Sequence, residues 1–135
     1  IVLLDGAHNP NGIEALKSAI QKFLPNKYII AITGMLADKD VSTSVKLLDG
    51  VFDRVYTVPV HNPRAMHPAK LMQQYAIFVD DTVTFESAEH AFDMAFEQAE
   101  KTDCAVVICG SLYLAGEIRP YIINKIKAEN ESAEK

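Results

Sequence analysis

The sequence of 135 residues contains no tryptophan, only two cysteines, and fewer basic residues (13) than acidic ones (18). The resulting net charge of −5 argues against binding of nucleic acid through its phosphates, because such binding needs a basic surface. The spacing of Cys104 and Cys109 fits no metal-binding or redox motif. We therefore expect buried free thiols, which are consistent with a reducing, cytoplasmic location.

Long apolar runs and a leader sequence are also missing. No apolar run approaches the roughly 18 residues of a membrane span, and no basic segment precedes the strand-like run at Ile1. The first residue is not methionine, so we expect the chain to be a piece of a longer gene product. Its length favours one domain, expected to be a monomer.

Apolar residues alternate between strand-like runs and helical stripes. The runs occupy residues 1–4, 28–33, 54–60, 76–80 and 104–110, and the stripes occupy residues 10–24, 41–52, 68–72, 87–101 and 112–126. Strands without polar alternation are buried on both faces, which favours a parallel sheet covered by helices. We predict an α/β fold, a three-layer Rossmann-like sandwich with a mostly parallel sheet of five or six strands.

Two segments allow exceptions to this pattern. The alternating residues 79–85 leave room for one antiparallel edge strand. Pro120 is expected to kink or split the last helix, because proline cannot donate the helical hydrogen bond. Residues 128–135 form a polar C-terminal tail that we expect to fray, so the predicted domain comprises residues 1–127.

Polar residues and glycines follow four of the predicted strands. In an open parallel sheet, ligands bind beyond the carboxyl ends of the strands, where these segments meet. They contain Asp5, Gly6, His8, Asn9, Gly34, Asp38, Lys39, Asp40, His61, Asn62, Arg64, His67, Gly110 and Ser111. The residues alone therefore predict a small-molecule site, suited to an anion, at one edge of the sheet.

Each of these residues also has a purely structural interpretation. Asp5 and Asn9 could cap the first helix, Asp40 could cap the second, and Arg64 could be a surface cation. The Gly-x-Ser-x-Gly nucleophile elbow and the phosphate-binding Gly-Lys motif are absent. No spacing of His, Asp and Glu indicates a zinc site either. Both interpretations stay open at this level.

Four blocks of the sequence resemble one enzyme family, in the family's order. The segment "LLDGAHNPNG" (residues 3–12) resembles the motif that opens the C-terminal domain of folylpolyglutamate synthase and dihydrofolate synthase. The segments "GMLADKD", "NPRAMHPAKL" and "CGSLYLAGEIRP" resemble three further blocks, and together the four extend to about Arg119. The shorter "AHNP" alone is similar to segments across the wider Mur-type ligase superfamily.

The resemblance implies the C-terminal domain of an ATP-dependent ligase that joins L-glutamate to dihydropteroate or a folate. ATP first phosphorylates the carboxylate of the pteroate or folate, and the amino group of glutamate then attacks the acyl phosphate. The family's phosphate loop and Mg²⁺ ligands lie in an N-terminal ATPase domain, which is the implied partner of this chain. We therefore expect no metal ligand in the chain and no activity from it alone.

The resemblance also implies roles for individual residues. The implied ATP-binding residues are Asp5, His8 and Asn9. The implied glutamate-binding residues are His8, Arg64 and Ser111. Lys39 and Asp40 are implied to face the cleft between the two domains. An arginine suits the glutamate site because its planar fork binds a carboxylate through two hydrogen bonds.

Two other functions are open. The chain could belong to a Mur-superfamily ligase that uses a different amino acid, or it could be a non-catalytic binding domain such as a receiver. A receiver needs an aspartate at the end of its third strand and a lysine after its fifth, and neither "TVPV" nor "CGSL" supplies them. The "GSLY" and "PRA" segments favour the folate ligase.

Overall fold

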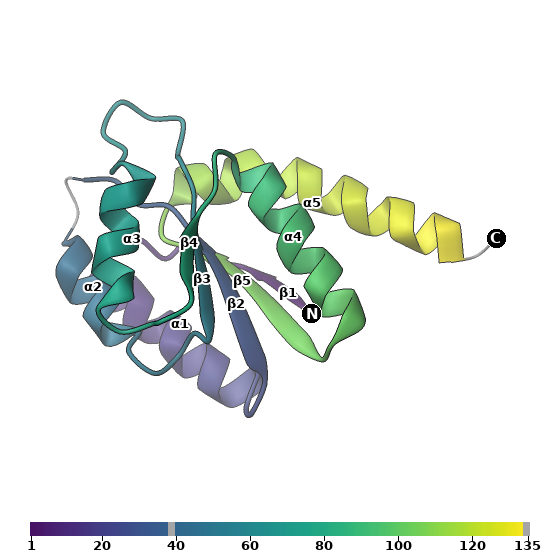
Figure 1. Cartoon of the computed structure of the whole chain (residues 1–135), viewed down its shortest axis with the longest axis horizontal. Coiled ribbons are helices and arrows are strands. Elements are labelled where there is room, and N and C mark those ends of the chain that lie inside the picture. Colours follow the sequence, from purple (N-terminus) through teal and green to yellow (C-terminus); the bar gives the residue numbers. More distant parts are fainter. Residues whose placement is uncertain (38–39, 134–135) are drawn as a thin grey trace.

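The structure is a computed structural model that describes residues 1–37 and 40–133. A helix follows each of its five strands (Figure 1). The strands are β1 (Val2–Leu4), β2 (Tyr28–Thr33), β3 (Arg54–Thr57), β4 (Thr82–Thr84) and β5 (Cys104–Cys109). The helices are α1 (Pro10–Phe23), α2 (Val41–Leu47), α3 (Pro68–Ala76), α4 (Ala88–Lys101) and α5 (Leu112–Ala133).

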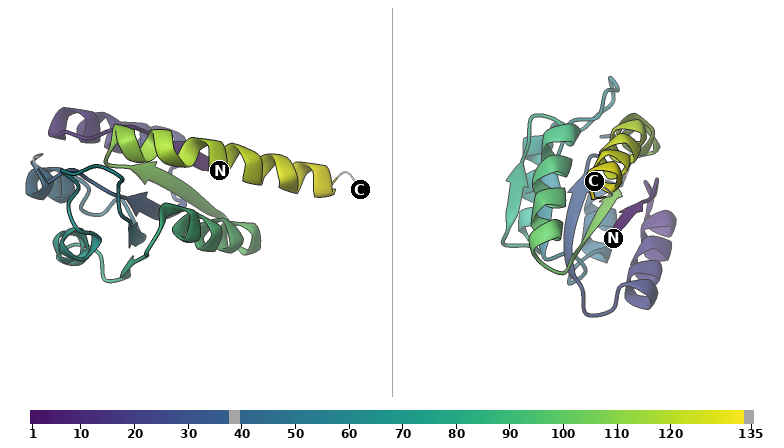
Figure 2. Two further views of the ribbon diagram at one scale, coloured as in Figure 1. Left: turned by 90° about the horizontal axis from the view of Figure 1, so that it is seen from above. Right: turned by 90° about the vertical axis from the view of Figure 1, so that its right-hand side faces the viewer.

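The five strands form one parallel sheet in the order β1-β5-β2-β3-β4. Helices α1, α2 and α3 pack on one face of this sheet, and α4 and α5 pack on the other (Figure 2). The molecule therefore has three layers, with the sheet in the middle. This arrangement confirms the predicted α/β, Rossmann-like sandwich.

Each face of the sheet has its own apolar core. Ala31 and Val107 project from the central strands onto one face, where they belong to the same buried cluster as Leu16 of α1. Their neighbour Ile30 projects to the opposite face and joins a second cluster that contains Phe92 of α4. Because successive strand residues point to opposite faces and both faces are covered, the central strands have no polar side.

The segment predicted as the fourth strand, residues 76–80, differs in the structure. Helix α3 continues to Ala76 because Leu71 and Tyr75, four residues apart, are both completely buried. The chain then makes a further turn, in which the N–H of Val79 donates to the carbonyl of Tyr75 (2.9 Å). The strand begins only at Thr82, so this part of the prediction is wrong.

The edge strand of residues 79–85 is parallel, not antiparallel. Strand β4 pairs with β3 in parallel register, with Val55 opposite Thr82. Within residues 1–37 and 40–133, antiparallel pairing is confined to one isolated bridge between Leu36 and Ala65. Strand β4 lies at the edge of the sheet, where Thr82 is half-buried and Val83 and Thr84 are exposed.

Helix α5 runs through Pro120 without interruption and ends at Ala133. The predicted split does not occur. Because Pro120 has no N–H, the carbonyl of Gly116, four residues earlier, has no helical donor. Both residues are exposed, so water can donate a hydrogen bond to that carbonyl. Of the residues expected to fray, 128–133 are helical, and four of these six are alanine or glutamate, which favour a helix. The C-terminal part of α5 extends beyond the sheet (Figures 1 and 2).

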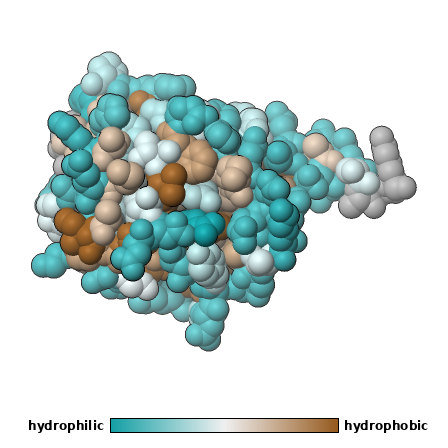
Figure 3. Space-filling model, viewed as in Figure 1, coloured by the Kyte–Doolittle hydropathy of each residue, from teal (hydrophilic) through white to brown (hydrophobic). Residues whose placement is uncertain are grey.

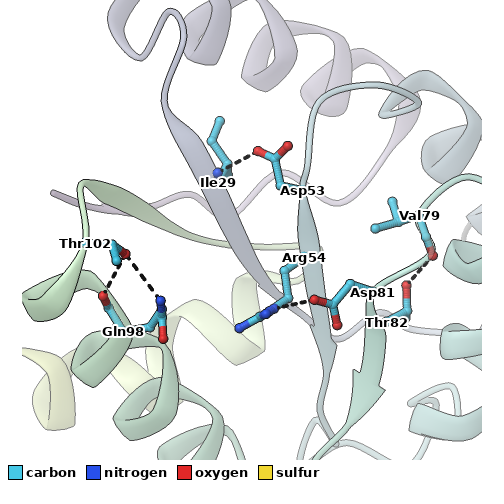
Figure 4. A network of polar contacts seen from close by, with 8 residues as sticks. All are labelled: Ile29, Asp53, Arg54, Val79, Asp81, Thr82, Gln98 and Thr102. Carbon is cyan, nitrogen blue, oxygen red and sulfur yellow. Dashed lines mark hydrogen bonds and ion pairs between the residues drawn. The ribbon is translucent and has the colours of Figure 1, made fainter.

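Polar contacts join the strands at their amino-terminal ends (Figure 4). Asp53 accepts a hydrogen bond from the N–H of Ile29 (2.8 Å), and Arg54 Nε donates to Asp81 Oδ2 (2.6 Å). The bond with Asp81 raises the pKa of Arg54. Because both side chains are partly exposed, we expect this pair to contribute about 1 kcal/mol or less to stability.

The surface is largely hydrophilic on the face shown in Figure 3. Hydrophobic residues appear there as small separate patches, and the projecting end of α5 is mainly hydrophilic. In the part of the chain that the structure describes, none of the helices combines the length and the apolar character required to cross a membrane.

Both cysteines are buried free thiols, as predicted. Burial raises the pKa of Cys109 from its ordinary value of 9.0 to about 12. The folded chain therefore keeps a proton that the unfolded chain loses, and this contribution to stability is complete below pH 9 and is lost as pH rises towards 12.

We expect the free energy of unfolding of the chain, measured by urea denaturation, to fall between pH 9 and 12. The fall should be less steep in Cys109→Ala than in the control Cys104→Ala. Equal slopes in the two variants would contradict this assignment and would point to other buried groups, such as Tyr75, whose pKa burial also raises.

Candidate functional site

A cavity of about 200 Å³ opens at the carboxyl-terminal edge of the sheet. Its lining residues come from the segments that follow β1, β2, β3 and β5. They are His8, Leu36, Arg64, Ser111, Leu112 and Tyr113. The predicted convergence of four segments on one edge is confirmed.

The strand order of the sheet determines where the cavity lies. Strand β5 lies between β1 and β2, and its helix α5 packs on one face while α1 and α2 pack on the other. The chain therefore leaves neighbouring strands in opposite directions, which opens a crevice beyond their carboxyl ends. The crevice follows from the path of the backbone.

Asp5 and Asn9 hold the loop between β1 and α1. Asp5 Oδ1 accepts a hydrogen bond from the N–H of Ala7 (2.7 Å). Asn9 Oδ1 accepts from the N–H of Gly12 (2.8 Å) and so caps α1. Neither side chain lines the cavity, so their predicted contacts with ATP stay predictions beside these structural roles.

His8 is the one residue of the predicted ATP-binding set that lines the cavity. Its Nδ1 lies 2.9 Å from the carbonyl oxygen of Gly6, an acceptor, so Nδ1 carries the hydrogen of this bond. In the neutral ring, Nε2 is then an acceptor that a ligand can use.

Arg64 is carried by a loop that is tied to the neighbouring loop after β2. The carbonyl of Arg64 accepts a hydrogen bond from the N–H of Ala37 (2.7 Å), and the next residue, Ala65, bridges to Leu36. The N–H of Arg64 donates to Asn62 Oδ1 (2.8 Å), which tightens the turn. These bonds hold the backbone of Arg64 at the rim of the cavity.

Ser111 immediately precedes α5 and is only 2% exposed. Its Oγ accepts hydrogen bonds from the N–H groups of Tyr113 (3.0 Å) and Leu114 (3.3 Å). Because the oxygen acts as the acceptor in both bonds, they leave the hydroxyl hydrogen to be donated to a ligand. The predicted glutamate-binding residues His8, Arg64 and Ser111 thus share one cavity.

Three apolar cavity residues, Leu36, Leu112 and Tyr113, were not predicted from the sequence. Apolar side chains were assigned to the core, where most of them lie. The helical periodicity of α5 did indicate two of these residues. Leu114 and Ile118 are buried, so Leu112 and Tyr113, which precede Leu114, lie on another face of the helix. Leu112 and Tyr113 are accordingly 62% and 48% exposed.

The residues predicted to face an interdomain cleft are Lys39 and Asp40. Asp40 caps α2, with its Oδ1 accepting a hydrogen bond from the N–H of Thr43 (3.3 Å), and it is exposed. Lys39 lies outside the described residues. The prediction for both residues remains a prediction.

The arrangement suits a small ligand that carries a carboxylate. The lining residues include an arginine, a histidine and a serine, whose side chains can all bind carboxylate oxygens. Its volume of about 200 Å³ lies below the range of about 300–1,000 Å³ typical of pockets for drug-sized ligands. Among residues 1–37 and 40–133, no three His, Cys, Asp or Glu side chains gather as metal ligands would.

Known proteins resemble the chain over most of its length. It is 30% identical over 121 residues to dihydrofolate synthase/folylpolyglutamate synthase of Escherichia coli, covering 90% of this chain and 28% of that protein. It is 34% identical over 124 residues to folylpolyglutamate synthase of Lacticaseibacillus casei, covering 91% of this chain and 27% of that protein. The chain therefore spans less than a third of the length of these relatives.

Solved structures share the fold. Escherichia coli FolC in complex with DHPP and ADP superimposes with a TM-score of 0.81, 29% identity, and coverage of 92% of this chain and 29% of that one. Folylpolyglutamate synthase of Mycobacterium tuberculosis complexed with ADP superimposes with a TM-score of 0.82 and 28% identity, and the match covers 89% of this chain and 29% of that one. The bifunctional folylpolyglutamate synthase/dihydrofolate synthase of Yersinia pestis, complexed with AMPPNP and Mn ion, superimposes with a TM-score of 0.77 and 26% identity. The match covers 90% of this chain and 28% of that one.

The family model described as "Mur ligase, glutamate ligase domain" matches residues 1–112. This match covers the segments that follow β1, β2 and β3, together with the Gly-Ser turn into α5. It also agrees with the four motif blocks and with the folylpolyglutamate synthases among the relatives. The chain belongs to the glutamate ligase domain family of the Mur ligases.

Proposed function

We propose that the chain is the C-terminal domain of an ATP-dependent, ADP-forming ligase that adds L-glutamate to dihydropteroate, to tetrahydrofolate, or to both. The observation that carries this proposal is the cavity in which His8, Arg64 and Ser111 meet, each from a different motif block. The activity named for the curated relatives supports the substrates. The ADP, AMPPNP, Mn ion and DHPP in related structures support a nucleotide, a divalent metal and a folate-type substrate.

The proposed reaction has two steps. A carboxylate oxygen of the folate substrate attacks the γ-phosphorus of ATP, so that ADP leaves and an acyl phosphate forms. The amino group of glutamate then attacks the acyl carbon, phosphate leaves with the bonding electrons, and the nitrogen loses a proton. Mg²⁺ is the proposed metal and would neutralise charge on the phosphates, with its ligands outside this chain.

The residues of the cavity have distinct proposed roles. Arg64 binds a carboxylate of glutamate, and Ser111 donates a hydrogen bond to the same substrate. His8 lies between the glutamate and the nucleotide, where Nε2 accepts a hydrogen bond. Asp5 and Asn9 are proposed to lie near the ribose of ATP, and Lys39 and Asp40 to line the interdomain cleft.

The size of the cavity supports a site shared between two domains. A volume of about 200 Å³ suits an amino acid or one end of a larger ligand. We therefore propose that the remaining contacts with ATP and the folate come from an N-terminal ATPase domain of the same chain. A cytoplasmic, monomeric enzyme is part of this proposal.

The test compares the 135-residue chain with a full-length protein that contains it. The chain alone should release no phosphate from ATP above background when glutamate and dihydropteroate or tetrahydrofolate are present. The full-length protein should release ADP and form a product heavier by one glutamyl residue, detected by mass spectrometry. Turnover by the chain alone, or a full-length protein that uses another amino acid instead of glutamate, would contradict the proposal.

A further inference from the structure

The loop that carries Arg64 is anchored on two sides. On one side, backbone hydrogen bonds and the Leu36–Ala65 bridge tie it to the loop after β2. On the other side, the N–H of His61 donates to Oε1 of Glu117 on α5 (3.0 Å). This hydrogen bond to α5 is made by a single side chain, that of Glu117.

The packing of α5 fixes the position of Glu117. Its neighbours on the helix, Leu114 and Ile118, are completely buried against the sheet. The Glu117 side chain is 28% exposed, whereas the His61 side chain is 80% exposed. The helix is thus the rigid partner of this contact, and the loop is the part that it holds.

The contact has two components of unequal strength. The bond between the carboxylate and the backbone N–H is charge-assisted, and such bonds are stronger than those between neutral groups. The second component is the distance of 3.6 Å between His61 Nδ1 and Glu117 Oε2, an ion pair only when the ring is protonated. Because the ring is largely exposed, water weakens this pair, and the backbone bond dominates.

Glu117 lies on α5, six residues after Ser111. Ser111 caps that helix, and Arg64 lies three residues after the His61 that Glu117 holds. Helix α5 therefore contacts both segments that bring Ser111 and Arg64 to the cavity. A loop released from Glu117 would lose this hydrogen bond to α5 and would keep its backbone bonds to the loop after β2.

We propose that Glu117 is a positioning residue for glutamate, which holds the loop of residues 61–64 against α5 so that Arg64 stays at a fixed distance from Ser111. This inference rests on the proposed role of Arg64 in glutamate binding. Glu117 acts through the loop and does not contact the substrate.

The kinetic test uses three variants of the full-length ligase. Glu117→Ala should raise the KM for glutamate about tenfold, with much smaller changes in kcat and in the KM for ATP, because a charge-assisted hydrogen bond is lost. Glu117→Gln should stay within about threefold of the parent, since its amide oxygen can still accept from the N–H of His61. The control Glu131→Ala removes an exposed carboxylate near the far end of α5 and should change nothing.

A second measurement separates this inference from the proposed function. Hydrogen exchange at the amide of His61, measured by NMR in the 135-residue chain, should be faster in Glu117→Ala and close to the parent in Glu117→Gln. If Arg64→Ala leaves glutamate saturation unchanged, the role of Arg64 is wrong, and the exchange data still report the anchor. Unchanged exchange in Glu117→Ala, or an unchanged KM where Arg64→Ala raises it, would overturn the role of Glu117.

Discussion

Replacing Arg64 with alanine in the full-length ligase is expected to raise the KM for glutamate about 10- to 150-fold, with little change in the KM for ATP. Glutamate brings two carboxylates to a chain whose net charge is −5, so its site needs a local cation. A guanidinium binds a carboxylate through two charge-assisted hydrogen bonds, and losing them costs roughly 1.5–3 kcal/mol. The measurement is steady-state kinetics with each substrate varied in turn.

Two further variants sharpen this experiment. Arg64→Lys keeps the charge but loses the planar fork, so its KM for glutamate should lie between the parent and Arg64→Ala. Arg119→Ala removes the same charge from an exposed position on α5 and should leave glutamate saturation unchanged. If Arg64→Ala matches this control, Arg64 does not bind glutamate and the proposed glutamate site is misplaced.

Gly110→Ala is expected to destabilise the 135-residue chain by about 2–5 kcal/mol. Gly110 has a φ of +106°, a conformation that L side chains rarely adopt. An added Cβ would also lie 2.7 Å from the carbonyl oxygen of Gly34 and 2.7 Å from Thr33 Oγ1. The first of these atoms belongs to the backbone and cannot move without shifting the loop after β2.

Gly116→Ala is the matched control for this prediction. Gly116 lies in α5 with open space around an added Cβ, so alanine should stabilise the chain by about 0.5–1 kcal/mol through its higher helix propensity. Urea denaturation of both variants at one pH gives the comparison. A Gly110→Ala variant as stable as the parent would show that the turn between β5 and α5 can adopt another backbone path.

The sequence predicted secondary structure well wherever one apolar pattern dominated. Strand β2 occupies the predicted residues 28–33, and α4 begins after Ser87, which caps it. The strand predicted at residues 76–80 is wrong because a run of four apolar residues is compatible with both a strand and a helical turn, and the burial of Tyr75 favours the turn. The order of the strands depends on contacts between distant segments, such as Val2 with Val106, which local patterns do not encode.

The candidate site was predicted only in its polar part. His8, Arg64 and Ser111 stood out because they follow predicted strands whose carboxyl ends meet at one edge of the sheet, where ligands bind. Glu117 did not stand out, because a glutamate on a helix is ordinarily a solvated residue. Its proposed role rests on a contact with His61, 56 residues away in the sequence, which only the folded chain reveals.

The exposed mouth of the crevice and the two cores that stabilise the fold are made largely of different residues in a domain with this strand order. The crevice exists because the backbone leaves β5 and its two neighbours in opposite directions, and the exposed residues at its mouth, such as Tyr113, add little to either core. Evolution can therefore exchange residues at the mouth while the cores of both faces stay intact. A few substitutions at the mouth can therefore change which ligand the crevice binds, while each successive variant still folds.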